Sequence, residues 1–186
     1  MTTLYIVLGI VVLIGLYLVA TYNGMIGARN RVDEAWSGID VQLKRRHDLI
    51  PNLVESVKGY ATHEKELFQS VTEARVKAMG ATGAAQAGVA EGALSSALGR
   101  LVAVAEAYPQ LRASENFMAL QQELANTEDQ IAGSRRIYNG NVQRYNTKIQ
   151  VFPNSVLASS FSFTPRDYFE LEAGNAERAP VDVSFS

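Results

Sequence analysis

The chain has 186 residues, a formal net charge of −2 at pH 7 and no cysteine. This length accommodates one domain and one apolar anchor, and the lack of cysteine excludes thiol catalysis, disulfides and cysteine-based metal sites. A charge so close to zero is not that of a nucleic-acid-binding domain, so we expect no nucleic-acid partner.

An uncharged apolar segment lies at the start of the sequence. Every residue in 4–20 is apolar, glycine or tyrosine, and the first charged side chain is Arg29. A helix needs about 20 residues to cross a hydrocarbon core of ~30 Å, and residues 3–22 supply that length. A cleaved signal peptide is the alternative, but no basic residue precedes the segment and no small-x-small cleavage site follows it. We therefore predict a transmembrane anchor over residues 1–23, with the lipid bilayer as its partner.

Basic residues after this segment predict its orientation. They are Arg29, Arg31, Lys44, Arg45 and Arg46, whereas the N-terminal side carries only the α-amino group. Lysine and arginine favour the cytoplasmic side of a membrane. We expect the N-terminus outside and the rest of the chain in the cytoplasm.

A 3.5-residue apolar period continues beyond the anchor and predicts helices. The apolar face of a first helix, continuous with the anchor, carries Val32, Ala35, Trp36, Ile39 and Leu43. Pro51 interrupts it as a turn or a kink, and residues 50–78 are predicted to form a second helix. Residues 80–92 are rich in glycine and alanine and are predicted to be a flexible connection.

Two further helices and a tail follow. A third helix is expected over residues 93–107, before Pro109, and a fourth over residues 114–150, before Pro153. The predicted fold is all-α: one transmembrane helix, an antiparallel four-helix bundle of long helices in residues 24–152, and an irregular tail in residues 153–186 with a helical turn at 154–159. A single long kinked hairpin is the competing architecture.

Four charged residues occupy apolar-period positions: Glu64, Arg75, Glu128 and Arg135. They either line the solvated margin of the bundle or form a buried, mutually paired network that fixes helix register. In the second case Glu128 and Arg135 are expected to pair. Asn139 and Asn146 lie beside tyrosines of the same seam.

The sequence offers no pattern that indicates an active site. His63-Glu64 would begin a zinc-protease motif, but the position of the second histidine is Leu67. His47, in a charged stretch, is expected to be solvated. The glycine-rich segment lacks both phosphate-binding patterns. We therefore predict no catalytic, cofactor-binding or metal-binding residues, no cofactor, and a protein that is not an enzyme.

Residues 45–54 (RRHDLIPNLV) resemble the signature of the LemA family. Further matching motifs are Thr127-Glu128, Arg135-Arg136-x-Tyr138-Asn139, Tyr145-Asn146, Phe152-Pro153-Asn154 and, at the end of the anchor, Tyr22-Asn23. The resemblance implies a bacterial protein with one N-terminal transmembrane helix and a helical bundle, and it assigns no catalytic residues. It also implies either membrane organisation, through a similarity to a magnetosome-membrane protein, or partnership with membrane metalloproteases.

Two functions remain open from the sequence. The first is a self-associating, membrane-anchored scaffold of the bacterial inner membrane, a homo-oligomer that organises or shapes the bilayer. The second is an adaptor that presents its bundle to a membrane protease or another membrane protein. An aromatic cluster in the tail either docks on a neighbouring subunit or closes over the end of the bundle: Phe161, Phe163, Tyr168 and Phe169.

Overall fold

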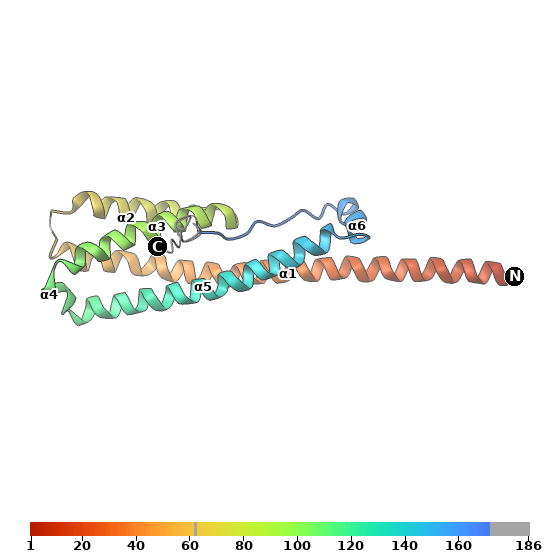
Figure 1. Ribbon diagram of the computed structural model, residues 1–186, viewed down its shortest axis with the longest axis horizontal. Helices are drawn as coiled ribbons and strands as arrows, with labels where there is room; N and C mark the ends of the chain where they lie inside the picture. Colours follow the sequence, from red (N-terminus) through yellow and green to blue (C-terminus); the bar gives the residue numbers. More distant parts are fainter. Residues whose placement is uncertain (62, 172–186) are drawn as a thin grey trace, which may run out of the picture.

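The computed structural model describes residues 1–61 and 63–171, in which the chain forms helices and no strand. The all-α class is therefore confirmed. The helices are α1 (Thr2–Lys58), α2 (Lys65–Met79), α3 (Gly83–Glu106), α4 (Pro109–Arg112), α5 (Glu115–Gln150) and α6 (Asn154–Ser160). The molecule is a rod in which α2, α3 and α5 lie beside the C-terminal part of α1, while the N-terminal part of α1 projects beyond them (Figure 1).

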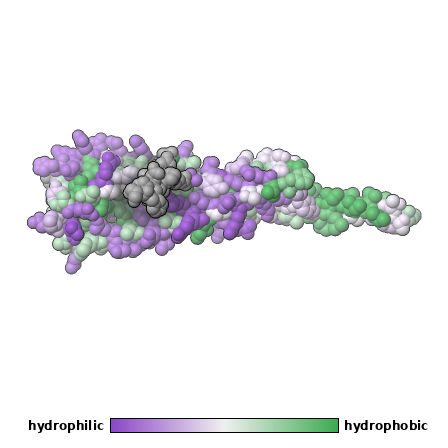
Figure 2. Space-filling view, in the orientation of Figure 1, coloured by the Kyte–Doolittle hydropathy of each residue, from purple (hydrophilic) through white to green (hydrophobic). Residues whose placement is uncertain are grey.

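The projecting part of α1 is the apolar segment. Every side chain of residues 2–20 is exposed, and Met25 is the first that is fully buried. Figure 2 shows this part of the surface as predominantly hydrophobic. Helix α3 is also long and apolar enough to cross a membrane, but 44% of its most apolar window is buried in the body. Part of the apolar surface of α3 is thus buried in the core, whereas the apolar side chains of residues 2–20 of α1 are all exposed.

Pro51 neither ends nor divides α1, so the prediction of a second helix that begins at residue 50 was wrong. Helix α1 continues to Lys58, and the break lies between Lys58 and Lys65. The proline removes one backbone hydrogen bond, but it is exposed, so its ring displaces no neighbouring helix. Burial of the surrounding apolar residues, among them Ile50, Leu53 and Val57, compensates for the lost bond.

The predicted flexible connection at residues 80–92 was also wrong. Helix α3 begins at Gly83, so only residues 80–82 join it to α2. Alanine is the strongest helix former and dominates this stretch. Gly88 and Gly92 are buried in the helix. A Cβ on Gly88 would lie 2.1 Å from the carbonyl oxygen of Glu170, so this glycine permits close approach of the C-terminal segment.

The last helices agree with the sequence patterns. Helix α5 spans 36 residues and ends before Pro153, and α6 replaces the single predicted turn. Helix α3 stops before Pro109, as expected, and α4 is a short addition. Helices α1 and α5 make the most extensive contact in the molecule, and α2 pairs with α3.

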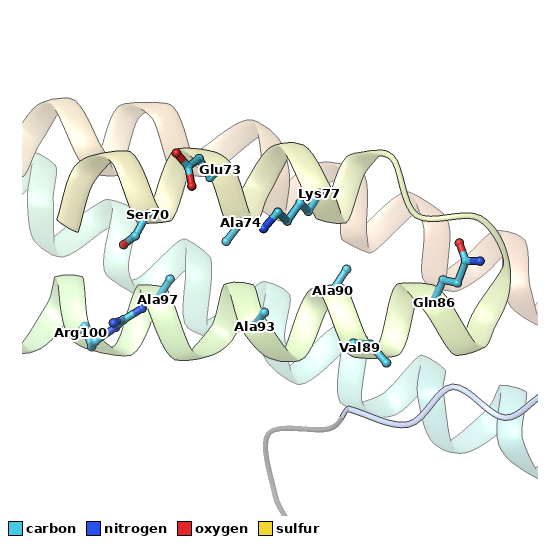
Figure 3. A pocket seen from close by; sticks show the side chains of 10 residues that line it. All are labelled: Ser70, Glu73, Ala74, Lys77, Gln86, Val89, Ala90, Ala93, Ala97 and Arg100. Carbon is cyan, nitrogen blue, oxygen red and sulfur yellow. The ribbon is translucent and has the colours of Figure 1, made fainter. Parts of the chain in front are cut away.

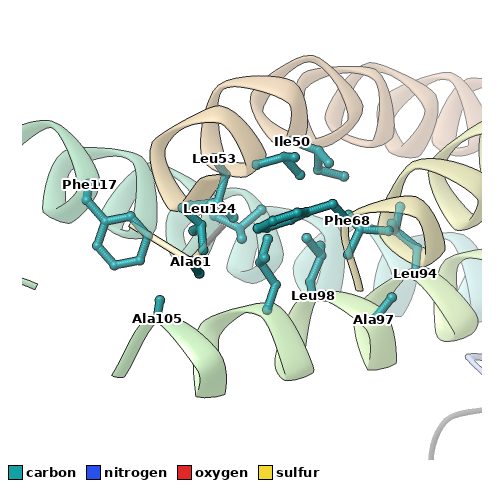
Figure 4. Packing of buried hydrophobic residues seen from close by; sticks show 14 of the residues in the cluster. Ile50, Leu53, Ala61, Phe68, Leu94, Ala97, Leu98, Ala105, Phe117 and Leu124 are labelled. Carbon is teal, nitrogen blue, oxygen red and sulfur yellow. The ribbon is translucent and has the colours of Figure 1, made fainter. Parts of the chain in front are cut away.

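Two apolar clusters hold the helices together. The first lies at the end of the rod that is remote from the N-terminus, where Phe68 of α2 points between Ile50 of α1 and Leu94 and Leu98 of α3 (Figure 4). The second lies along α1 and α5 and contains Met25, Ile39, Tyr145 and Phe169, among others. The buried polar residues described next come from the same helices.

Candidate functional site

Arg46 of α1 is the centre of a buried polar cluster. Its side chain is 1% exposed. Nη1 donates a hydrogen bond of 2.7 Å to Glu91 Oε2 of α3, and Nη2 donates one of 2.6 Å to Ser95 Oγ. Nη2 also lies 2.7 Å from Glu128 Oε1 of α5. One guanidinium thus joins three helices, which suits its fixed fork of donors.

Glu91 connects Arg46 to the neighbouring His47. The Glu91 side chain is 1% exposed, and its second oxygen lies 2.6 Å from His47 Nε2. A carboxylate accepts on both oxygens, so the ring N–H of His47 is the donor. The fourth long helix joins through Arg75 of α2, whose Nε donates to the backbone oxygen of His47 at 2.7 Å. The expectation that His47 is solvated was therefore wrong.

Glu128 lies at the edge of this cluster. Burial raises the pKa of its carboxyl, because desolvation penalises the charged form more strongly than Arg46 favours it, and Glu91 adds a like charge. The side chain is 39% exposed, so one side of the carboxyl reaches solvent. The cluster therefore has a fully buried pair, Arg46 and Glu91, and one carboxylate that contacts water.

The predicted seam charges are brought only partly together. Glu128 is paired, but with Arg46 and not with Arg135, so that proposed pairing was wrong. Arg135 is half-buried beside Tyr168 in a surface hollow. Arg75 reaches the cluster, whereas Glu64 is the residue that precedes α2. The reason is distance along the helix: Glu128 and Arg135 are seven residues apart, so they lie on nearly the same face of α5 but about 10.5 Å from each other, beside different neighbours.

The two residues that were missed, Arg46 and Glu91, carry a signal in the sequence. Arg46 lies three residues after Leu43 and four before Ile50, both buried. Glu91 lies four residues after Ala87 and three before Leu94, which are also buried. Each charge therefore occupies an apolar-period position of its own helix. The basic neighbours of Arg46 and the glycines around Glu91 obscured this signal.

A second constellation binds the segment after α6 to α5. The Tyr138 hydroxyl donates to the backbone oxygen of Asp167 and the Tyr145 hydroxyl to that of Thr164, each at 2.9 Å. Asn139 donates to the oxygen of Phe169 at 3.1 Å and accepts from its N–H at 2.9 Å. Asn146 makes the same two-bond pair with Arg166. Two Tyr-Asn pairs, seven residues apart, thus bind an extended backbone.

The spacing of the two Tyr-Asn pairs along α5 nearly equals the spacing of their partners along the extended segment. Seven helical residues rise about 10.5 Å, and three extended residues rise about 10 Å. The tyrosines at 138 and 145 therefore meet residues 167 and 164, with the segment antiparallel to α5. Phe169 is fully buried, and its ring lies 5.8 Å from that of Trp36. We call residues 161–171, held in this way, the clasp.

Of the two alternatives for the tail aromatics, the described part of the tail adopts the intramolecular one. Phe163 and Phe169 are buried in the second apolar cluster. The chain after α6 runs along the side of the rod and not over its end (Figure 1). Phe161 and Tyr168 are exposed. Residues 172–186 lie outside the described part, so the predicted irregular tail is described only as far as Leu171.

Helices α2 and α3 enclose an open groove of about 550 Å³. Small side chains from both helices line it, among them Ala74, Ala90 and Ala93, while Lys77 and Arg100 stand at its edges (Figure 3). Small residues leave the helix backbones accessible to an approaching apolar side chain. Within residues 1–61 and 63–171, no three His, Asp or Glu residues gather in a way that could hold a metal ion.

Comparison with known proteins decides the family. A family model described as "LemA family" matches residues 35–185, which include the buried cluster and the clasp. The chain belongs to the LemA family. The resemblance seen in the sequence motifs is thereby confirmed. The matched range begins after the apolar segment, so the assignment of an anchor in this LemA-family chain rests on its own residues.

Curated relatives of this LemA-family chain have similar identities. It is 28% identical to Magnetosome protein MamQ 2 of Paramagnetospirillum magneticum, over 82% of the chain and 66% of that protein. It is 28% identical to Magnetosome protein MamQ of Magnetospirillum gryphiswaldense, over 85% and 68%. It is also 28% identical to Protein LemA of Metamycoplasma hominis, over 87% and 74%. The chain thus spans about two thirds of the length of the MamQ proteins. Its family and its exposed, apolar N-terminal helix together indicate a membrane-associated helical protein.

Proposed function

We propose that this LemA-family protein is a membrane-anchored scaffold that self-associates and thereby organises or shapes a bacterial inner membrane, without catalytic activity. The observation that carries the proposal is the combination of an exposed apolar helix with a rod whose polar cluster is buried. The buried side chains of Arg46 and His47 both bond to Glu91. We therefore expect the protein to act through contacts of its surface and through its membrane anchor.

The relatives support a membrane setting. Two of them are named magnetosome proteins, and we extend an organelle-membrane role from them to this chain. Confinement by the anchor raises the local concentration, so modest contacts suffice for assembly. Head-to-tail contacts between identical rods form rings when the rotation closes and filaments when it does not. We place the rod in the cytoplasm because basic residues such as Arg29 and Arg31 follow the anchor.

The test is the mass of the full-length protein in detergent. Light scattering across a dilution series, in two mild detergents, should give one large particle that contains only this chain. A monomer at every concentration in both detergents would contradict self-association. A reporter at the C-terminus that is active only outside the cytoplasm would contradict the proposed orientation.

The second candidate is an adaptor for a membrane protease or another membrane protein, and the groove between α2 and α3 favours it. Exposed Ala93 lies in the floor of that groove, so Ala93→Glu would place a charge against any apolar partner segment. Ala125→Glu, at an exposed position of α5, is the matched control. A stoichiometric second protein that co-purifies with the wild type and the control, but not with Ala93→Glu, would favour the adaptor over the scaffold.

A further inference from the structure

The segment around α6 is apolar and exposed. Residues 149–165 contain no charged side chain; the nearest charges in sequence are Lys148 and Arg166. Four large apolar side chains in this segment are exposed: Val151 (46%), Phe152 (83%), Val156 (59%) and Phe161 (56%). A contiguous group of exposed apolar side chains on a polar body indicates an interaction site.

This apolar group is continuous with the end of the anchor. The Tyr17 hydroxyl donates to Asn154 Oδ1 at 3.3 Å, and the rings of Tyr22 and Phe161 lie 4.9 Å apart. A hollow of about 270 Å³ between the two helices is lined by apolar and aromatic side chains: Leu18, Val19, Tyr22, Leu157 and Phe161. Figure 2 shows the hydrophobic surface of α6 meeting that of the anchor.

The position of α6 beside the anchor indicates how deep α6 would lie in the bilayer. If residues 3–22 fill the hydrocarbon core, Tyr17 lies five residues, or about 7.5 Å, inside the edge of that core. Asn154, which is bonded to Tyr17, is then at that edge or within it. Helices that lie in a membrane interface are buried by about 5–10 Å, which is the same depth.

Basic groups are present at the adjoining level. The Arg29 guanidinium lies 5.6 Å from the centroid of the Phe163 ring. Lys148 reaches α1 at Gly24, where its Nζ lies 2.6 Å from the position of a Cβ. Both cations lie next to the apolar group, on the side that is farther from the hydrocarbon core. Lipid phosphates are expected at this level of the membrane.

We propose that α6 and its flanking residues Val151, Phe152 and Phe161 form a second membrane contact, which inserts into the interface of a phospholipid bilayer beside the anchor. The inference rests on the anchoring part of the proposed function and not on self-association. Two contacts at different radial positions fix the tilt of the rod and its rotation about the anchor. Copies in one membrane then present the same faces to one another.

The full-length chain provides a direct test because it has no cysteine of its own. Single cysteines at Phe152 and Val156 are spin-labelled in protein reconstituted in phosphatidylcholine–phosphatidylglycerol vesicles. Leu8→Cys in the anchor is the lipid reference, and Ile137→Cys, at a 65% exposed residue of α5, is the matched control on the rod. Collision rates with oxygen, which enters lipid, and with a water-soluble nickel chelate are compared.

Labels at 152 and 156 should favour oxygen over the chelate, as the label at 8 does, while the label at 137 favours the chelate. If the label at 8 reports lipid but those at 152 and 156 behave like 137, the second contact is wrong and the anchor stands. If the label at 8 itself reports water, anchoring fails as well. Protection from both reagents at 152 and 156 would mean that protein covers the group, which also overturns the proposal. Circular dichroism verifies the fold of each variant, and labels at Val151 and Phe161 repeat the measurement.

Discussion

Arg46 and Glu91 are both 1% exposed, and each makes more than one polar contact. Two buried charges gain little over apolar residues of the same size, but removal of one partner leaves the other charge buried and uncompensated. The pair therefore adds little to stability, but it specifies the register of two helices, because α1 and α3 must pack with these two residues opposite each other.

The first prediction concerns this pair. Glu91→Ala should lower the free energy of unfolding by about 3–5 kcal/mol, because it leaves Arg46 buried without its main carboxylate. Glu123→Ala is the matched control: it breaks the exposed pair between Glu123 and Arg45, which also joins two helices, and should cost about 0–1 kcal/mol. Denaturant titration of the full-length chain, followed by circular dichroism, measures both. Equal and negligible losses would contradict a buried pair.

The second prediction concerns pH. The pKa of Glu128 is raised above its ordinary value of 4.5 by burial, so the folded chain holds this proton more tightly than the unfolded chain does. The stability due to protonated Glu128 is complete below pH 4.5 and is lost as the pH rises through the raised pKa. In the variant Glu128→Gln, residue 128 does not titrate. Relative to this variant, the wild type should therefore become less stable as the pH rises from 4.5 through the raised pKa of Glu128. Thermal melts of both chains decide the sign, and an opposite slope would contradict it.

At the scale of elements, the clasp is the feature that closes the rod. Its residues 164–171 are not helical and make no backbone hydrogen bonds to one another, so α5 supplies their partners through its two Tyr-Asn pairs. Burial raises the pKa values of Tyr138 and Tyr145, which remain neutral donors to the clasp at physiological pH. On its other side the clasp contacts α3, where Gly88 leaves space for the oxygen of Glu170.

The third prediction compares two glycines of α3. Gly88→Ala should displace the clasp, because the new methyl group meets backbone that cannot move without breaking the bonds to Asn139. Gly99→Ala meets nothing within 4 Å and should stabilise the helix by roughly 0.5–1 kcal/mol. The two variants should thus shift the melting temperature in opposite directions. Hydrogen exchange at the Phe169 amide should accelerate at least tenfold in Gly88→Ala alone; unchanged protection there would show that the clasp tolerates the methyl group.

At the scale of the whole molecule, the anchor and the rod share one helix but few contacts. All side chains of residues 2–20 are exposed, while Met25 and Ala28 belong to the core. Tyr17 and Tyr22 are in between, because they contact Asn154 and Phe161. The energetic boundary of the rod therefore lies near Tyr17, a few residues before the expected end of the anchor.

The fourth prediction follows from this boundary. Removal of residues 1–16 deletes no buried side chain, so the remaining chain should keep the helical content and the unfolding midpoint of the rod. Removal of residues 1–28 also deletes Met25 and Ala28 and should lower the midpoint markedly, since a buried methionine alone is worth about 2–5 kcal/mol. Both truncations are compared with the full-length chain in the same detergent. A large loss on removal of residues 1–16 would mean that the anchor stabilises the rod.

Several features could be predicted from the sequence because their causes are local. The apolar segment, the all-α class and the extent of α5 follow from composition, from a 3.5-residue period and from the position of Pro153. The motifs around residues 45–54 and the Tyr-Asn pairs were enough to indicate the family. Each of these signals is contained in a few neighbouring residues.

The tertiary structure decided the rest, because the causes lie far apart in the chain. Whether Pro51 ends a helix depends on which side of α1 faces solvent, and whether a glycine-rich segment is helical depends on what packs against it. Glu91 is 45 residues from Arg46, and Phe169 is 30 residues from Asn139. A buried charge or an extended backbone is stable only where its partners are supplied, and those partners become neighbours only when the helices pack.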